Sequence, residues 1–332
     1  MEVRMMSYTK LKPKKMSLFD FTQTYANDLM KCVEFFINMK WPDGFACDRC
    51  DCHEYWIIKR QGKTKTTYIL ECKECHKQYS LLSGTIFEKC HLDLYKLLLG
   101  IFLFFNESKG ISATTLRSHL DVNIKTAQLL ATKCRILMSL SNAKRLLDSP
   151  FYESDVCFIG SPTKGKPGRS TEKQPVLAIL STQQDNNYPM YLKARMISNE
   201  RGETLKENVE KNCILSQDRT LNTDGDKGFN SLKEKIKVKN EVVDYNQPNH
   251  RLKWINIIIG NLKNNITGIY HGVGKREMPL FLNEQEYRFN HRYTGKEMFN
   301  KVKEYLQISF PITHKQIVNA LDQTYIQLIL AC

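Results

Sequence analysis

Four cysteines arranged as two Cys-x-x-Cys pairs are the residues of this sequence with the clearest chemistry. They are Cys47, Cys50, Cys72 and Cys75, and 21 residues separate the two pairs. Each pair can present two thiolates on one side of a tight turn, and two such turns make a tetrahedral sulfur cage that suits zinc. Because four ligands close the coordination shell, we predict a structural zinc ion. Three further residues lie nearby and are predicted not to be ligands: Cys52, His53 and His76.

Two stretches between the cysteine pairs have the composition of strands. Residues 55–60 and 66–71 are rich in aromatic and β-branched side chains, and residues 61–63 can form the turn between them. A hairpin of this kind would bring the two pairs together. We therefore predict a zinc ribbon over residues 41–90, after a basic lead-in over residues 1–40. Since ribbons bind proteins as well as DNA, the pattern specifies the metal more closely than the partner.

Residues 91–148 have helical periodicity and are predicted to form a DNA-binding domain. The last two predicted helices have the form of a helix-turn-helix: Ser112 to His119, a break at residues 121–123, and Ile124 to about Leu140. Leu116, Leu120 and Val122 would pack against Ala127 and Leu130.

The second of these helices has polar side chains that could enter the major groove of DNA. We predict DNA binding by Asn123, Lys125, Thr126, Gln128, Lys133 and Arg135. The polar side chains at its start would face base edges and its lysines would contact phosphates. The alternative interpretation is a helical bundle with a solvated charged face.

The pattern changes again after Pro150. Strands are predicted at residues 156–159, 176–181, 191–196 and 220–223, and helices at residues 202–212, at residues 229–235 and from about Leu252. Short strands followed by helices predict a separate α/β domain.

The overall charge favours a polyanionic partner. The 332 residues contain 49 Lys and Arg against 35 Asp and Glu, a net charge of +14, and nucleic acid is the commonest partner of such a chain. A basic soluble protein without such a partner is the alternative. The longest apolar run, residues 97–105, is too short to span a bilayer. The first 16 residues contain no apolar core of a secretory signal. The odd count of 11 cysteines and the paired pattern indicate a reducing, intracellular compartment.

Six stretches, in this order, resemble the insertion sequence 1595 transposases of bacteria and their eukaryotic relatives, the Merlin superfamily. They are residues 41–50 (WPDGFACDRC), 83–87 (SGTIF), 109–113 (KGISA), 223–225 (TDG), 268–273 (GIYHGV) and 287–290 (YRFN). The resemblance runs from about residue 30 to the C-terminus. It implies a multidomain α+β protein, with a zinc ribbon and a helix-turn-helix followed by a ribonuclease-H-like domain with a mixed sheet over residues 149–310. A C-terminal helix is expected over residues 311–332.

The resemblance also implies an activity. Two acids and a third ligand would hold two Mg²⁺ or Mn²⁺ ions, and the enzyme would cleave DNA at transposon ends and join the freed 3′-OH to target DNA. The expected partners are double-stranded terminal inverted repeats, target DNA and further copies of the chain on DNA; no membrane partner is expected. The expected compartment is the nucleus if the host is eukaryotic and otherwise the cytoplasm.

The family pattern places the two acids at Asp155 and Asp224 and the third ligand at Asn256. Lys263 follows Asn256 by seven residues, on the same helical face, and would contact a phosphate. Asn261 is the alternative third ligand. Taken alone, each Asp could be a turn former or a helix cap, and Asn256 an ordinary polar residue of a half-buried helix.

Three positions depart from the family pattern, and one loop adds to it. The family's helical Glu is here Asn256, which can ligate Mg²⁺ only through a neutral amide oxygen. The acid that commonly follows the first Asp is here Val156, and a family Gly is here Ser161. The basic loop of residues 165–169 could contact the DNA backbone. Three functions therefore remain: an active transposase, a domesticated or decayed DNA-binding descendant, and a zinc-ribbon transcription or protein-interaction module without nuclease ancestry.

Overall fold

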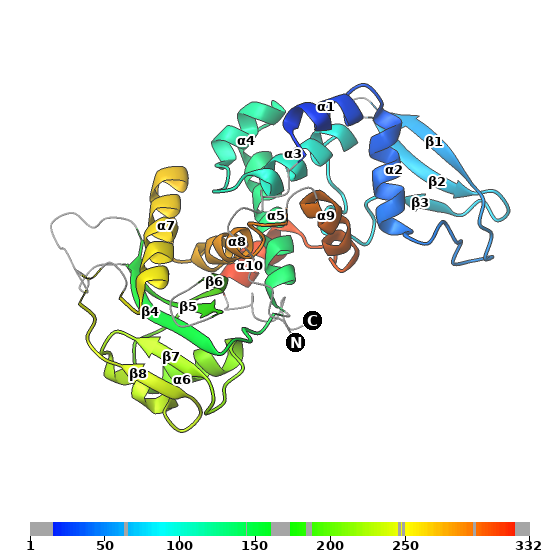
Figure 1. Cartoon of the computed structure of the whole chain (residues 1–332). Coiled ribbons are helices and arrows are strands. Elements are labelled where there is room, and N and C mark those ends of the chain that lie inside the picture. The colour runs from blue at the N-terminus through cyan, green and yellow to red at the C-terminus, as the bar shows by residue number, and fades with distance from the viewer. Residues whose placement is uncertain are drawn as a thin grey trace. The chain divides into compact units, whose positions relative to one another are not determined.

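The computed structural model describes residues 16–62, 66–143, 145–160, 173–183, 188–244, 247, 250–294 and 297–322, without the side chains of residues 297–300 and 320–322. The chain forms two compact units (Figure 1). The N-terminal unit comprises residues 1–108, 113–134 and 291–313, and the second unit comprises residues 109–112, 135–290 and 314–332.

The N-terminal unit contains a three-stranded antiparallel sheet. Its strands β1 (Tyr55–Gln61), β2 (Thr66–Cys72) and β3 (Gln78–Ser80) are hydrogen-bonded in the order β1-β2-β3. The register pairs Tyr55 with Cys72 and Leu70 with Tyr79, so one face of the sheet carries these aromatic residues beside a cysteine. The strand-turn-strand predicted for the ribbon is confirmed.

Helices form the rest of the described part of this unit. They are α1 (Leu18–Tyr25), α2 (Leu29–Lys40), α3 (Leu94–Asn106), α4 (Ala113–Leu120), the part of α5 (Ile124–Ala143) up to Cys134, and α9 (Glu297–Gln307). The predicted lead-in thus contains two helices over its described part. Nine of the 13 residues of α3 are buried, which is expected of a helix at the centre of a core. Phe21 of α1 stacks on Phe102 of α3 with ring centroids 4.3 Å apart. Within the described residues, no helix is long and apolar enough to cross a membrane.

The other unit is built on a five-stranded mixed sheet, as predicted after residue 150. Its strands are β4 (Phe151–Ile159), β5 (Gln174–Thr182), β6 (Pro189–Met196), β7 (Thr220–Thr223) and β8 (Lys237–Asn240), in the order β6-β5-β4-β7-β8. β4, β5 and β6 pair antiparallel, whereas β4, β7 and β8 pair parallel. β4 begins five residues before the predicted strand, and β8, whose residues are mostly polar or charged, was not predicted.

Helices cover both faces of this sheet (Figure 1). α7 (Lys253–Tyr270) and α8 (Met278–Asn290) pack on the face that carries Cys157 and Ile159 of β4, and α6 (Gly202–Asn212) and the 3-10 helix η1 (Lys227–Leu232) pack on the face that carries Tyr152. The predicted helix at residues 229–235 is therefore a shorter 3-10 helix, while the prediction for residues 202–212 is confirmed. Because side chains alternate along a strand, Glu153 and Asp155 lie on the same face of β4 as Cys157 and Ile159, toward α7.

Side chains of α8 pair with the edge strand β6. Asn290 accepts from the N–H of Leu192 at 2.7 Å and donates to its carbonyl at 3.0 Å, as a neighbouring strand would. Glu284 is fully buried between Arg135 and Arg288, with N–O distances of 2.7 and 2.6 Å. The stretch at residues 287–290 is thus part of the internal packing of this unit.

The unit boundaries differ from the domains expected from the sequence. α9 lies in the N-terminal unit, where it contacts α2 and α3, although residues 149–310 were expected to form one domain. α10 (His314–Asp322) lies in the same unit as the mixed sheet, and residues 323–332 of the predicted C-terminal helix are outside the described residues.

Candidate functional site

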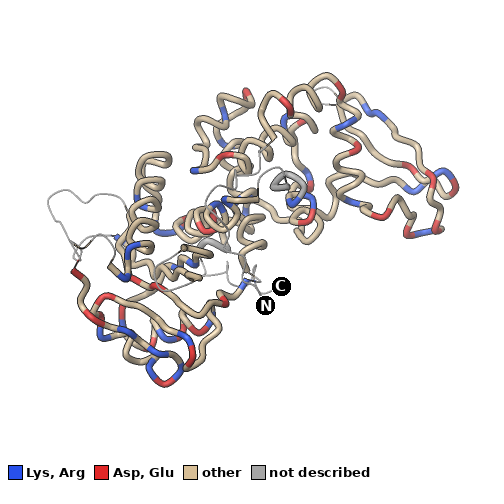
Figure 2. Tube along the Cα trace, in the orientation of Figure 1, with Lys and Arg blue, Asp and Glu red and all other residues tan. Residues whose placement is uncertain are grey.

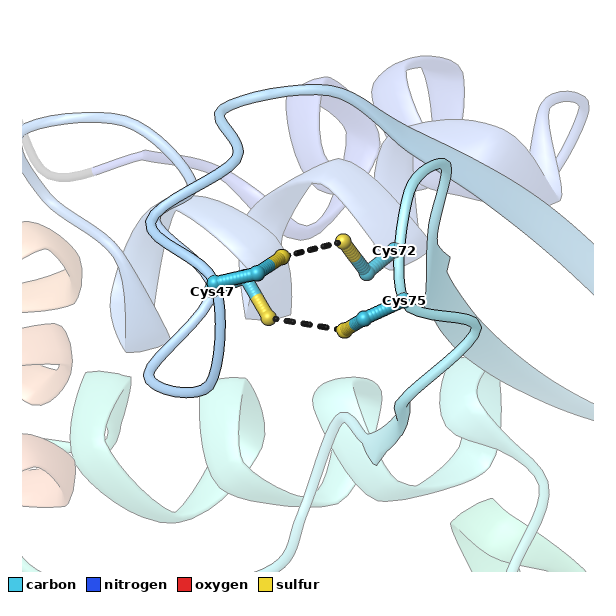
Figure 3. Close-up of side chains that lie close together, drawn as sticks. Cys47, Cys72 and Cys75 are labelled. Carbon is cyan, nitrogen blue, oxygen red and sulfur yellow. Dashed lines mark hydrogen bonds between the residues drawn. The ribbon is translucent and has the colours of Figure 1, made fainter.

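The four predicted cysteines meet in the N-terminal unit. The Sγ atoms of Cys47 and Cys75 lie 3.4 Å apart and those of Cys50 and Cys72 lie 3.5 Å apart (Figure 3). All four sulfurs lie within 4.8 Å of one another. Zinc–sulfur bonds of about 2.3 Å place the sulfurs of a tetrahedron about 3.8 Å apart, so the donor set and its spacing fit a structural zinc ion.

The two cysteine turns have the same backbone conformation. The residue after each pair, Asp51 or His76, is left-handed, with φ of 59° and 57°. The N–H of Asp51 donates to the carbonyl of Cys47 at 2.8 Å, and that of His76 donates to the carbonyl of Cys72 at 3.1 Å. Each turn therefore presents its two sulfurs on one side, as the sequence pattern predicts.

Neighbouring polar groups contact the four-sulfur cluster, and the three other candidate ligands contact groups outside it. Tyr79 donates to the Sγ of Cys47 at 3.1 Å, which supports its thiolate form. The Sγ of Cys52 lies 3.4 Å from the backbone N of Glu54, and the rings of His53 and His76 contact the carbonyl of Phe45 and the carboxylate of Glu71. None of the three belongs to the four-sulfur cluster found among the described residues.

Helices α4 and α5 and their connection follow the predicted boundaries closely. Leu116, Leu120, Ala127 and Leu130 are buried as predicted, and Val122 is half-buried. Gly100 of α3 leaves room for two side chains, because a Cβ at this position would lie 2.6 Å from a methyl group of Leu130 and 2.9 Å from one of Leu120. Helices α4 and α5 therefore pack closely on α3.

The polar face predicted for α5 is only partly exposed. Asn123, Lys125 and Gln128 are exposed and Thr126 is half-buried. The exposure predicted for Lys133 and Arg135 is wrong: both are buried, because Lys133 donates to the carbonyl of Ile86 at 2.5 Å and Arg135 pairs with Glu284. Of the polar face predicted to bind DNA, only the part at the first two turns of α5 is exposed.

The two predicted acids lie on neighbouring parallel strands. Glu153 of β4 pairs with Asn222 of β7, and two further residues along this register bring Asp155 level with Asp224. Asp155 lies inside β4, whereas the shorter predicted strand placed it at a strand end; Asp224 directly follows β7, as predicted. The observed pairing ends at Glu153 and Asn222; continued by two residues, it would place both carboxylates on one side of the sheet.

The electrostatics of Asp155 reflect this proximity. Burial raises the pKa of Asp155, the hydrogen bond from the N–H of Val156 lowers it, and the charge of Asp224 raises it again. The charge of Lys263 lowers the pKa of Asp155, and the charge of Asp226 raises it. Asp224 accepts from the N–H of Val243 at 3.0 Å, which fixes its position at the end of β7.

Helix α7 carries the predicted third ligand. Asn256 and Lys263 are seven residues apart and therefore point in nearly the same direction, whereas Asn261 points almost opposite to Lys263. The charge of Lys263 lowers the pKa of Asp155, and Asn256 directly follows Ile255, whose N–H donates to Glu153 on the strand of Asp155. The buried Nδ2 of Asn256 has no hydrogen-bond partner among the described residues. Asn256 is therefore preferred to Asn261 as the proposed third ligand.

Comparison with protein families matches both units. Residues 30–78 match the transposase zinc-ribbon domain of the insertion sequence 1595 family, and residues 151–290 match the ISXO2-like transposase domain. The chain belongs to the insertion sequence 1595 transposase family. A comparison with curated proteins finds no significant match. A zinc-ribbon module without nuclease ancestry is therefore not supported, because the mixed sheet is present and carries the transposase match.

The departures from the family pattern have different structural settings. Val156 packs with the core on the α6 side of the sheet, opposite to Asp155, so it does not reach the acids. Ser161 and the basic loop at residues 165–169 lie outside the described residues.

Two acids near the predicted site were not identified from the sequence. Asp226 caps η1 through the N–H of Gly228, and its charge raises the pKa of Asp155. Glu153 lies two residues before Asp155 and is fully buried. Strand alternation places Glu153 on the Asp155 face and could have singled it out, since a Glu is rarely buried on a strand without a partner.

Proposed function

We propose that this transposase is an active cut-and-paste enzyme, with Asp155, Asp224 and Asn256 as the ligands of its catalytic metal ions. The observation that carries the proposal is the parallel register of β4 and β7, which brings Asp155 level with Asp224. The strand order β6-β5-β4-β7-β8, with its mixed directions, supports a ribonuclease-H-like domain.

Each of these residues has a defined task in the proposed site. Asp155 and Asp224 supply negative oxygens from adjacent strands, and Asn256 supplies a neutral amide oxygen from α7. Two bound Mg²⁺ or Mn²⁺ ions would activate the attacking oxygen and stabilise the leaving oxygen. Lys263, exposed on the same face of α7 as Asn256, would bind a phosphate of the DNA strand.

The reaction consists of two phosphoryl transfers. In the first, a water oxygen bonds to the phosphorus at the transposon end, the phosphodiester P–O bond breaks, and the strand leaves with a 3′-OH. In the second, this 3′-OH attacks a target phosphorus, and the target strand is displaced with a 3′-OH of its own. Asp155 and Asp224 would serve both steps, which need the same metal site.

Duplex DNA is the proposed partner of α4 and α5. Residues 91–148 contain eight Lys and Arg, of which Lys133 and Arg135 are buried, against four Asp and Glu, whereas residues 41–90 contain eight against seven. In Figure 2 the basic and acidic residues of the ribbon are intermixed. Because phosphate binding requires excess positive charge, the helices are better suited than the ribbon to hold transposon ends. Assembly of several copies on DNA belongs to the same proposal.

A strand-transfer assay tests the enzymatic proposal. The full chain is incubated with Mg²⁺ or Mn²⁺, a pre-cleaved duplex of its terminal repeat and a supercoiled target. We expect joined products from the wild type and none from Asp155→Asn or Asp224→Asn. Asp218→Asn is the matched control, because Asp218 is an exposed acid of the same unit that precedes β7, at the end of this strand opposite to Asp224. Absence of products from the wild type, or equal activity of the Asp155 variant, would exclude the proposal.

Asn256 also favours a second candidate, a domesticated or decayed DNA-binding protein without catalysis. A neutral ligand in place of an acid weakens metal binding. This candidate predicts tight, salt-sensitive DNA binding and no cleavage. Asn256→Glu distinguishes the two: tighter Mn²⁺ binding by the variant indicates an intact site, and unchanged absence of binding indicates a decayed one.

A further inference from the structure

Glu153 is a fully buried acid on the strand that carries Asp155. Its Oε2 accepts a hydrogen bond from the backbone N–H of Ile255 at 2.8 Å, across 102 positions of sequence. A buried carboxylate is costly unless it is hydrogen-bonded or paired. The contact therefore indicates a defined task for Glu153, and its partner lies in the first turn of α7.

Helix α7 begins without a side-chain cap from its own segment. Its N-cap residue is Leu252, and no side-chain cap hydrogen bond is formed there. The first N–H groups of a helix have no partner inside the helix. The Glu153 carboxylate supplies an acceptor oxygen for one of them from β4, so a tertiary contact helps to fix the start of α7.

The Glu153–Ile255 contact lies next to Asp155 on β4 and next to Asn256 on α7, two of the proposed metal ligands. Glu153 and Asp155 lie two residues apart on β4 and therefore point to the same face of the sheet. Ile255 directly precedes Asn256. This hydrogen bond thus ties the first turn of α7 to the strand of the first acid.

The far end of α7 is held by a different hydrogen bond. Tyr270, the last residue of the helix, donates to Glu284 at 2.6 Å. Tyr270 lies 14 positions after Asn256, about 21 Å along a helix. Tyr270→Phe therefore removes one buried hydrogen bond of α7 without loosening the turn of Asn256, and it provides a matched control.

We propose that Glu153 is a positioning residue that sets Asn256 against Asp155 by anchoring the start of α7. This inference rests on the proposed metal site. Glu153 has no accessible surface and acts through Ile255, so it is not itself assigned as a metal ligand. Glu153→Gln keeps an acceptor oxygen at the same place, whereas Glu153→Ala removes it.

Two measurements on the full chain test the proposal. Hydrogen exchange reports whether the first turn of α7 is anchored, and the Mn²⁺ concentration at half-maximal strand transfer reports the geometry of the site. For Glu153→Ala we expect faster exchange in a peptide covering residues 252–258 and a requirement for about tenfold more Mn²⁺ or higher, the range known for groups that orient metal ligands. For Glu153→Gln and Tyr270→Phe we expect wild-type exchange in this peptide and an unchanged Mn²⁺ requirement.

Three outcomes would overturn the inference. They are unchanged exchange in Glu153→Ala, faster exchange there with an unaltered Mn²⁺ requirement, and a Glu153→Gln variant as impaired as Glu153→Ala. The last result would make Glu153 a charged participant. A wild type without any metal response would refute the proposed function, and the exchange comparison would still decide whether Glu153 anchors α7.

Discussion

At the scale of single residues, Gly110 lies against a buried pair of polar side chains. Its φ is 116°, and a Cβ there would lie 2.0 Å from Tyr270 Oη and 3.0 Å from Glu284 Oε1. We expect Gly110→Ala to lower the free energy of unfolding by about 2 kcal/mol or more, because backbone strain and a displaced buried hydrogen bond combine. Urea denaturation measures this change.

Gly260 provides the control in the same unit. It lies inside α7, where an added Cβ meets nothing within 4 Å. Gly260→Ala should therefore raise the free energy of unfolding by roughly 0.5–1 kcal/mol, as alanine usually does in a helix. Equal effects of the two substitutions would contradict the contacts assigned to Gly110.

At the scale of elements, the zinc ribbon depends on four sulfurs and not on the fifth cysteine nearby. We expect one zinc ion per chain in the wild type, loss of most of this zinc in Cys47→Ser, and no loss in Cys52→Ser. The reason is that the Sγ of Cys52 contacts Glu54 and lies outside the four-sulfur cluster. Metal analysis of the purified proteins measures the stoichiometry. Zinc retained in Cys47→Ser, or lost in Cys52→Ser, would refute the ligand set.

The helix pair α4–α5 separates exposed from buried basic residues. Lys125 is exposed at the start of α5, so Lys125→Ala should weaken binding to all duplex sequences and reduce the slope of log affinity against log salt by about one. Fluorescence anisotropy over a salt series measures this slope, and the free energy of unfolding should not change.

Lys133 is the matched control on the same helix. It is buried and donates to the carbonyl of Ile86, so Lys133→Ala should lower the free energy of unfolding by about 1–3 kcal/mol. Its salt slope should equal that of the wild type. A slope that changes in Lys133→Ala and not in Lys125→Ala would place the DNA elsewhere.

At the scale of the whole molecule, the features that follow from local pattern were predictable. The cysteine spacing identified the zinc cage, and periodicity located α4, α6 and β7, because each depends on residues close in sequence. The position of Asp155 in the middle of β4 was missed, since polar residues at 152–155 hide the first half of that strand. The burial of Lys133 and Arg135 depends on partners far away in the chain, Ile86 and Glu284, and periodicity alone cannot identify them.

The acid site shows the same division. Asp155, Asp224 and Asn256 were mapped through resemblance to a family, while the proposed approach of the two acids depends on the parallel pairing of β4 and β7. Strand alternation could have placed Glu153 on the face of Asp155, but its contact could not be inferred from the sequence, because its partner is a backbone N–H 102 positions away. The sequence thus identifies the candidate site residues, and the structure identifies the contacts that position them.

The most direct test is a crystal of the full chain soaked in Mn²⁺ and measured for anomalous scattering. Anomalous density is predicted between the carboxylates of Asp155 and Asp224, with the amide oxygen of Asn256 turned toward it, and no such density in crystals of Asp224→Asn. Carboxylates that face opposite sides of the sheet, or Mn²⁺ bound only at other acids, would contradict the proposed metal site.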